Sequence, residues 1–139
     1  MSNWTHVAGI LRIDFIRFEE ISEQEYLDAI DEIFGKEYDY DSPRELWEEA
    51  GEHPEEFLPA GSEGSLHKSM WLNPDKSCMA AMTVSIFGDL RDHDSPGEII
   101  EWFKGKCENE DLMIRNAVIT VENEWNGTRT WVYDRKKNK

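Results

Sequence analysis

One short stretch concentrates side chains that could do acid–base or metal chemistry. The segment GDLRDHD at 88–94 holds three carboxylates, one imidazole and one guanidinium: Asp89, Asp92, Asp94, His93 and Arg91. Such a set could hold a divalent ion or pair a base with a water molecule. Its spacing lacks the glycine of a calcium loop. We interpret it as a solvated loop before a helix, with a metal-dependent enzyme using Asp89–Asp94 as a second alternative function.

Other familiar catalytic patterns are missing from the sequence. The four histidines are far apart, and there is no HExxH, GxSxG, Walker or dinucleotide-binding motif. The segment GSEGS at 61–65 is rich in glycine, but it lacks the lysine of a phosphate loop. Cys78 and Cys107 form no CxxC pair, and we expect both to be buried thiols. We therefore predict no catalytic residue, no metal site and no cofactor.

Two similar segments, YDSPRE at 40–45 and HDSPGE at 93–98, predict where helices begin. In each, serine would be the N-cap, proline the first helical residue and glutamate the reciprocal acid of a capping box. The N-caps would be Ser42 and Ser95, and Gly51 would end the first of these helices. A third helix is predicted from Ser22 to Gly35, with Glu25 completing its capping box.

The remaining apolar pattern predicts five strands. They cover 5–18, 65–73, 77–88, 112–125 and 128–134, and Asn126-Gly127 predicts a hairpin between the last two. We predict a ferredoxin-like split βαβ sandwich, an α+β fold with an antiparallel sheet of strand order 5-4-1-3-2. The helices would cover one face, with an extra short helix in the first helix-to-strand connection.

Composition limits the class of protein. The chain has 139 residues, of which 39% are hydrophobic, with six tryptophans and six phenylalanines. This suits one domain over 1–139 with a real core, and we expect an acidic helix and loop insertion at about 36–65. Without an apolar run of about 18 residues or a secretory signal, we expect a cytoplasmic protein.

The negative charge is confined to one third of the chain. Between Glu19 and Glu63 there are 17 acids and two bases, Lys36 and Arg44. The charge of this segment is therefore −15, which is also the net charge of the whole protein. Such a field repels nucleic acids and anionic membranes and attracts basic proteins. We call residues 19–63 the acidic segment.

These features favour a non-enzymatic interaction module that engages a basic protein partner, as an immunity protein or a decoy would. The expected partner-binding residues are five acids and two strand tryptophans: Glu48, Glu49, Glu52, Glu55, Glu56, Trp71 and Trp131. The alternative is a structural or assembly subunit that forms oligomers, such as a homodimer, through its sheet edges.

Overall fold

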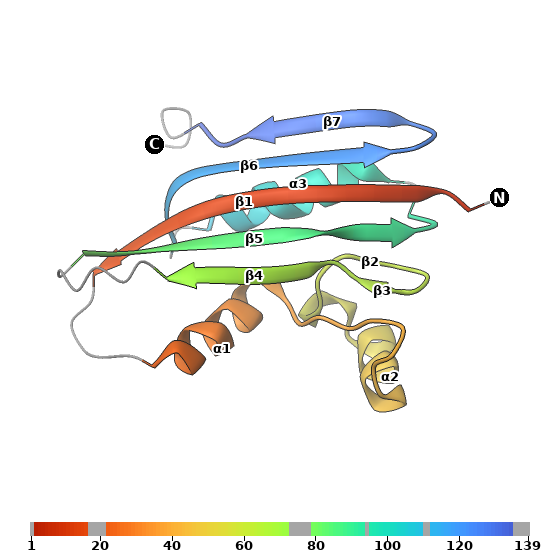
Figure 1. Cartoon of the computed structure of the whole chain (residues 1–139), viewed down its shortest axis with the longest axis horizontal. Helices are drawn as coiled ribbons and strands as arrows, with labels where there is room; N and C mark the ends of the chain where they lie inside the picture. Colours follow the sequence, from red (N-terminus) through yellow and green to blue (C-terminus); the bar gives the residue numbers. More distant parts are fainter. Residues whose placement is uncertain (1, 17–21, 73–78, 94, 110–111, 135–139) are drawn as a thin grey trace.

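The computed structural model describes residues 2–16, 22–72, 79–93, 95–109 and 112–134. Their elements alternate between strands and helices (Figure 1). In chain order they are β1 (Trp4–Ile16), α1 (Glu23–Phe34), α2 (Arg44–Glu52), the 3₁₀ helix η1 (Pro54–Glu56), β2 (Ala60–Gly61), β3 (Gly64–Ser65), β4 (His67–Leu72), β5 (Met79–Arg91), α3 (Pro96–Cys107), β6 (Met113–Asn123) and β7 (Gly127–Val132).

The protein is an α+β fold built on a five-stranded antiparallel sheet. The strand order is β4-β5-β1-β6-β7, and β2 and β3 form a separate two-stranded ribbon. The predicted order 5-4-1-3-2 differs in its numbers because those two short strands were not expected. When only the five long strands are counted, the sheet has the predicted order, seen from its other edge. The hairpin of β6 and β7 also lies where Asn126-Gly127 predicted it.

One face of the sheet carries the core. Val7, Leu11 and Ile13 alternate along β1 and are buried on this face. Helix α1 adds Tyr26, Ile30 and Phe34 to the core, while α3 adds Ile99, Phe103 and Cys107. Burial of these apolar stripes is the main force that holds the helices on the sheet.

The other face of the sheet is covered by no helix in the described part of the chain. It is turned toward the viewer in Figure 1, where α3 lies behind the strands. Large apolar side chains that are more than 40% exposed on it include Ile10, Trp71, Phe87 and Val132. We call this surface the open face.

The start of α1 agrees with the predicted serine cap, whereas the caps of α2 and α3 differ from the prediction. Ser22 caps α1 as expected, because its Oγ accepts a hydrogen bond from Glu25 N at 3.2 Å. Helix α2 instead has Pro43 as its N-cap, since Ser42 Oγ accepts from the amide of Asp39 at 2.9 Å. Ser95 is the N-cap of α3 by position, but its side chain makes no capping bond.

Gly51 was predicted to end a helix, and this was wrong. Helix α2 continues through it to Glu52. By contrast, Gly35 does end α1, with a φ of 115° that an L-residue adopts only with strain.

Candidate functional site

The GSEGS and GDLRDHD segments, far apart in sequence, meet at one end of the sheet. Ser62 N donates to the carbonyl oxygen of Arg91 at 2.9 Å, and the guanidinium of Arg91 lies 2.5 Å from Glu63 Oε1. Gly61 allows this approach, because a Cβ there would lie 2.5 Å from the same carbonyl oxygen. The β2–β3 ribbon is therefore fixed against the end of β5.

Asp92 joins this region to the N-terminal residues. Its φ is 58°, which is unusual for a residue other than glycine. The amide of Asp92 donates to the carbonyl oxygen of Asn3 at 2.6 Å, and Asn3 N donates to Asp92 Oδ1 at 3.2 Å. This reciprocal pair ties the loop after β5 to the start of the chain.

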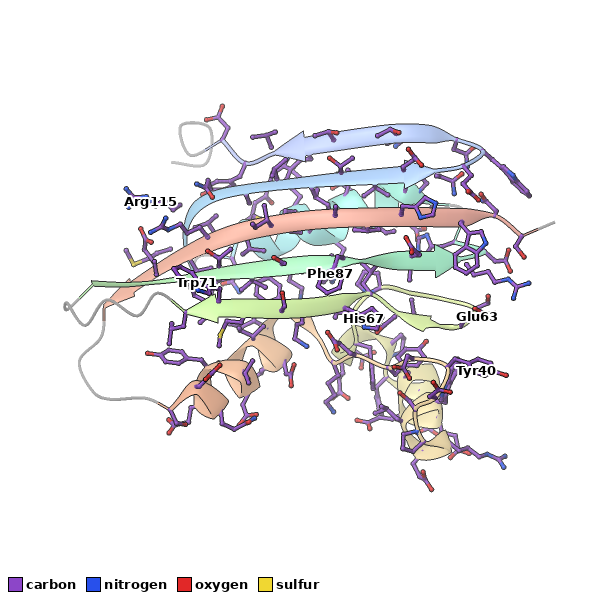
Figure 2. The ribbon with its side chains drawn as sticks, in the orientation of Figure 1. Tyr40, Glu63, His67, Trp71, Phe87 and Arg115 are labelled. Carbon is purple, nitrogen blue, oxygen red and sulfur yellow. The ribbon has the colours of Figure 1, made fainter. Side chains whose placement is uncertain are left out.

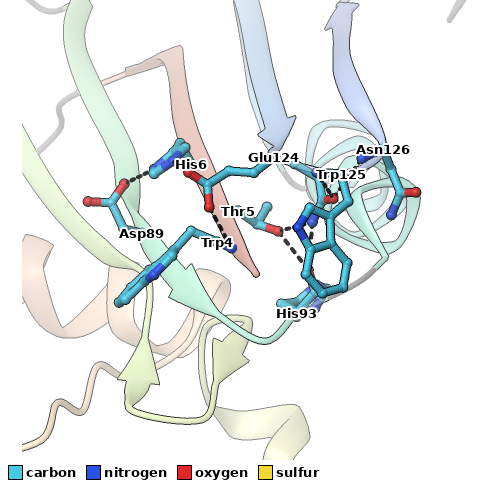
Figure 3. Close-up of polar contacts among 9 residues, drawn as sticks. Trp4, Thr5, His6, Asp89, His93, Glu124, Trp125 and Asn126 are labelled. Carbon is cyan, nitrogen blue, oxygen red and sulfur yellow. Dashed lines mark hydrogen bonds and ion pairs between the residues drawn. The ribbon is translucent and has the colours of Figure 1, made fainter. Parts of the chain in front are cut away.

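A buried polar network fixes the loop after β5 (Figure 3). Thr5 Oγ1 donates to the carbonyl oxygen of His93 at 2.6 Å, and Asn123 Nδ2 donates to Thr5 Oγ1 at 2.9 Å. Asn123 Oδ1 accepts from the amides of Trp125 and Asn126. Since Thr5 and Asn123 are almost fully buried, these bonds hold the sheet end in one arrangement.

His6 lies between two carboxylates on the open face at this end. Its Nδ1 is 2.6 Å from Asp89 Oδ1, and its Nε2 is 3.6 Å from Glu124 Oε2. The hydrogen bond to Asp89, with a smaller contribution from Glu124, raises the pKa of His6 above its ordinary value. Figure 3 shows Asp89 and Glu124 on opposite sides of the ring.

Beside His6, the sheet end and two loops enclose a cavity of about 200 Å³. We call it the corner cavity. Its walls combine aromatic rings from three parts of the chain with three carboxylates and one guanidinium. The side chains that form these walls are Trp4, Tyr40, His67, Asp39, Glu63, Asp89 and Arg91. Figure 2 shows Tyr40 and Glu63 at this end of the molecule.

The acids predicted to bind a partner lie together on α2 and η1. Glu52, Glu55 and Glu56 are exposed. Glu48 pairs with Arg44 at 3.1 Å, and Glu49 with Lys36 at 2.8 Å. Both of those bases belong to the acidic segment itself, so the pairing leaves the segment strongly negative.

The two tryptophans predicted with these acids are not brought together. Trp71 lies on the open face and is 58% exposed. Trp131 is opposite the buried Ile119 in the β6–β7 pairing. Its ring is half-buried on the helix side of the sheet, 6.0 Å from that of Phe103. The two rings therefore belong to opposite faces of the sheet.

The described residues contain no cluster of side chains that fits the metal-dependent alternative. No group of three or more His, Cys, Asp or Glu side chains there is arranged to hold an ion. Asp94 lies outside the described residues, as does Cys78. Cys107 is buried in the core, and burial together with the nearby Glu108 raises its pKa to about 12.

The sequence interpretation missed the corner cavity, although its signals were present. GSEGS and GDLRDHD were each examined alone and discounted. In the predicted order, the strand that follows GSEGS pairs antiparallel with the strand that ends in GDLRDHD. The start of one strand then lies beside the end of the other. That pairing indicated that Glu63 lies near Arg91. Trp4 is placed there by the β1–β5 pairing, whereas the contribution of Tyr40 depends on loop conformation.

Comparison with known proteins does not assign a family. The chain matches no protein-family model, no curated protein and no solved structure. In the described part of the chain, no helix is long and apolar enough to cross a membrane.

Proposed function

We propose that this protein is a non-enzymatic interaction module, with a ferredoxin-like fold and a place in the cytoplasm, that engages a basic protein partner through its acidic segment. The observation that carries the proposal is the shortage of positive charge around that segment. Within the described residues, two lysine or arginine side chains from elsewhere form ion pairs with it: Lys68 pairs with Asp31, and Arg91 with Glu63. The surplus of acids therefore stays on one part of the molecule.

The arrangement of the elements supports this function. Helices α1 and α2 both lie beyond the β4 edge of the sheet in Figure 1. A negative field on one side steers a basic partner into one orientation and raises the rate of association. Partners with clustered lysine and arginine gain most, whereas nucleic acids and acidic proteins are repelled.

The test compares two variants that lose equal charge. In the first, the acids Glu48, Glu52, Glu55 and Glu56 of α2 and η1 become glutamine. In the second, the exposed acids Glu98, Glu101, Glu108 and Glu122 become glutamine. Glu49 is kept because it holds Lys36. Proteins captured from the source cell at low salt are identified by mass spectrometry, and binding is then measured with the purified partner.

We expect the wild type to capture a basic protein and the first variant to bind it at least about tenfold more weakly. The second variant should bind as the wild type does. Equal losses in both variants would show a general charge effect, and unchanged binding by the first variant would remove the acidic segment from the mechanism. Either result contradicts the proposal.

The open face favours a second candidate, an assembly subunit that pairs with another copy. Ile10, Phe87 and Trp71 expose apolar area on this face, and such patches often mark interfaces. Sedimentation at high protein concentration tests this candidate. A dimer that the change Trp71→Ser dissociates would support it, and a strict monomer would exclude it.

A further inference from the structure

We propose that the corner cavity binds a guanidinium group, the side chain of an arginine that the basic partner presents. This inference rests on the proposed function and names the partner group that one site recognises. It is argued from the charge of the cavity, the state of its acids, its aromatic walls and its size.

The charge of the cavity favours a cation. Asp39, Glu63 and Asp89 contribute three carboxylates, against the guanidinium of Arg91 and the imidazole of His67. Arg91 is already engaged, because Glu63 pairs with it and its Nε donates to Ser2 Oγ at 2.9 Å. Asp39 has no cationic partner among the described residues, and Asp89 has only the imidazole of His6. With Asp39 and Asp89, the cavity wall keeps a surplus of negative charge.

Those two carboxylates have acceptor capacity to offer. Asp89 Oδ1 accepts from His6, and Asp39 Oδ1 accepts from Asp41 N and Ser42 Oγ. The second oxygen of each has no partner among the residues that the structure describes. A guanidinium presents five N–H donors in a plane and can satisfy such oxygens with directed, charge-assisted bonds.

The aromatic walls distinguish a guanidinium from an ammonium. Tyr40 is 76% exposed, a high value for so large an aromatic side chain, and Trp4 lies across from Arg91 in the β1–β5 pairing. Flat, weakly hydrated guanidinium groups stack on aromatic rings more readily than lysine does. Tyr40 and Trp4 can supply such surfaces at the cavity.

The cavity is of a size that suits one side chain. Its volume of about 200 Å³ is below the roughly 300–1,000 Å³ of sites for drug-sized ligands. An anionic ligand held by Arg91 is the opposing possibility. It would place negative charge beside Asp39, Glu63 and Asp89, which disfavours it.

The experiment uses two peptides, Gly-Gly-Arg-Gly-Gly and Gly-Gly-Lys-Gly-Gly, both with blocked ends. Binding is followed by NMR through the indole N–H signal of Trp4. We expect the arginine peptide to shift this signal and to bind about fivefold or more tightly than the lysine peptide. Inorganic phosphate serves as the anionic probe and should leave the signal unchanged.

Two variants and two controls locate the site. Asp89→Asn should weaken binding of the arginine peptide about tenfold, because one charged hydrogen-bond acceptor is lost. Tyr40→Ala should weaken it about threefold, and its exposed position makes a folding defect unexpected. Two control variants should bind the arginine peptide as the wild type does. They are Glu122→Gln, in β6, and Trp125→Ala, an exposed aromatic residue; neither residue lines the cavity.

Equal binding of both peptides, no shift of the Trp4 signal, or a shift with phosphate instead would overturn the inference. The glutamine variant of α2 and η1 separates it from the proposed function. That variant should lose the basic partner yet retain binding of the short arginine peptide. Loss of the partner with no peptide binding in the wild type would leave the proposed function standing and reject the cavity.

Discussion

At the scale of residues, His6 shows how the sheet end controls the state of a titratable group. Its ring donates to Asp89 and faces Glu124, so its protonated form is favoured in the folded protein. A group whose pKa is raised on folding stabilises the protein below its unfolded pKa of about 6.5, and the contribution is lost as pH rises through the folded pKa. The surface position of His6 keeps this contribution small.

We expect His6→Gln to flatten the pH dependence of the free energy of unfolding above about pH 6.5. Urea unfolding at several pH values measures it. His53→Gln is the matched control for loss of an exposed histidine, because His53 is the N-cap of η1 and lies outside the His6 contacts. A wild-type profile identical to that of His6→Gln would contradict the assignment.

Cys107 is expected to be inert in the native state. Its thiol is buried in the core and its pKa is raised to about 12, so almost no thiolate forms at neutral pH. In the background Cys78→Ser, a thiol reagent should react with Cys107 only after urea unfolds the protein. Rapid labelling of the folded protein would show that the core around α3 is open.

Single residues were predictable where one local interaction decides their role. Ser22 caps α1 as expected, because its Oγ and the Glu25 amide lie within one helical turn. The Glu25 carboxylate accepts from Ser22 Oγ, which is not the backbone bond of the predicted capping box. Ser42 has the same local pattern, yet it bonds to Asp39 in the preceding turn. A serine side chain can bond either to the helix it precedes or to the turn before it. The sequence alone therefore could not decide which of these bonds Ser42 makes.

At the scale of elements, two glycines should respond oppositely to the same change. A Cβ at Gly35 would lie 2.6 Å from the carbonyl carbon of Phe57, and φ there is 115°. We expect Gly35→Ala to cost about 1–3 kcal/mol of unfolding free energy. At Gly51, inside α2, a Cβ meets nothing within 4 Å, so Gly51→Ala should stabilise the protein by about 0.5–1 kcal/mol.

Thermal and urea unfolding of the two variants provides the check. Equal destabilisation by both would mean that Gly51 does not lie in a regular helix. A neutral Gly35→Ala would mean that the chain after α1 does not pass against Phe57. The contact that Gly35→Ala would disturb is the parallel β-bridge between Lys36 and Phe57.

Long strands were easier to predict than the connections between them. Alternation places Val7 and Leu11 on one face of β1. In β6 the period is interrupted by a register shift opposite Arg12 and Ile13, which the sequence pattern did not predict. The β2–β3 ribbon has two residues in each strand, too few to show a period. Its position depends on the close approach of Gly61 to Arg91, a tertiary contact that local sequence does not encode.

At the scale of the whole molecule, three surfaces of different character coexist. The acidic segment carries the net charge, the open face exposes apolar side chains, and the corner cavity lies where loops of that segment meet the sheet. Asp39, Tyr40 and Glu63 come from the segment, while Asp89 and Arg91 come from β5. Long-range attraction by the segment can therefore deliver a basic partner to a site with specific geometry.

Hydrogen–deuterium exchange with the captured basic partner tests this account most directly. The account predicts slower exchange at 44–56, in α2 and η1, and at 61–64, beside the corner cavity. Exchange in α3, at 96–107, should not change. Protection confined to α3 or to the strands of the open face, with no change at 44–56, would contradict the central claim that the acidic segment is the surface that meets the partner.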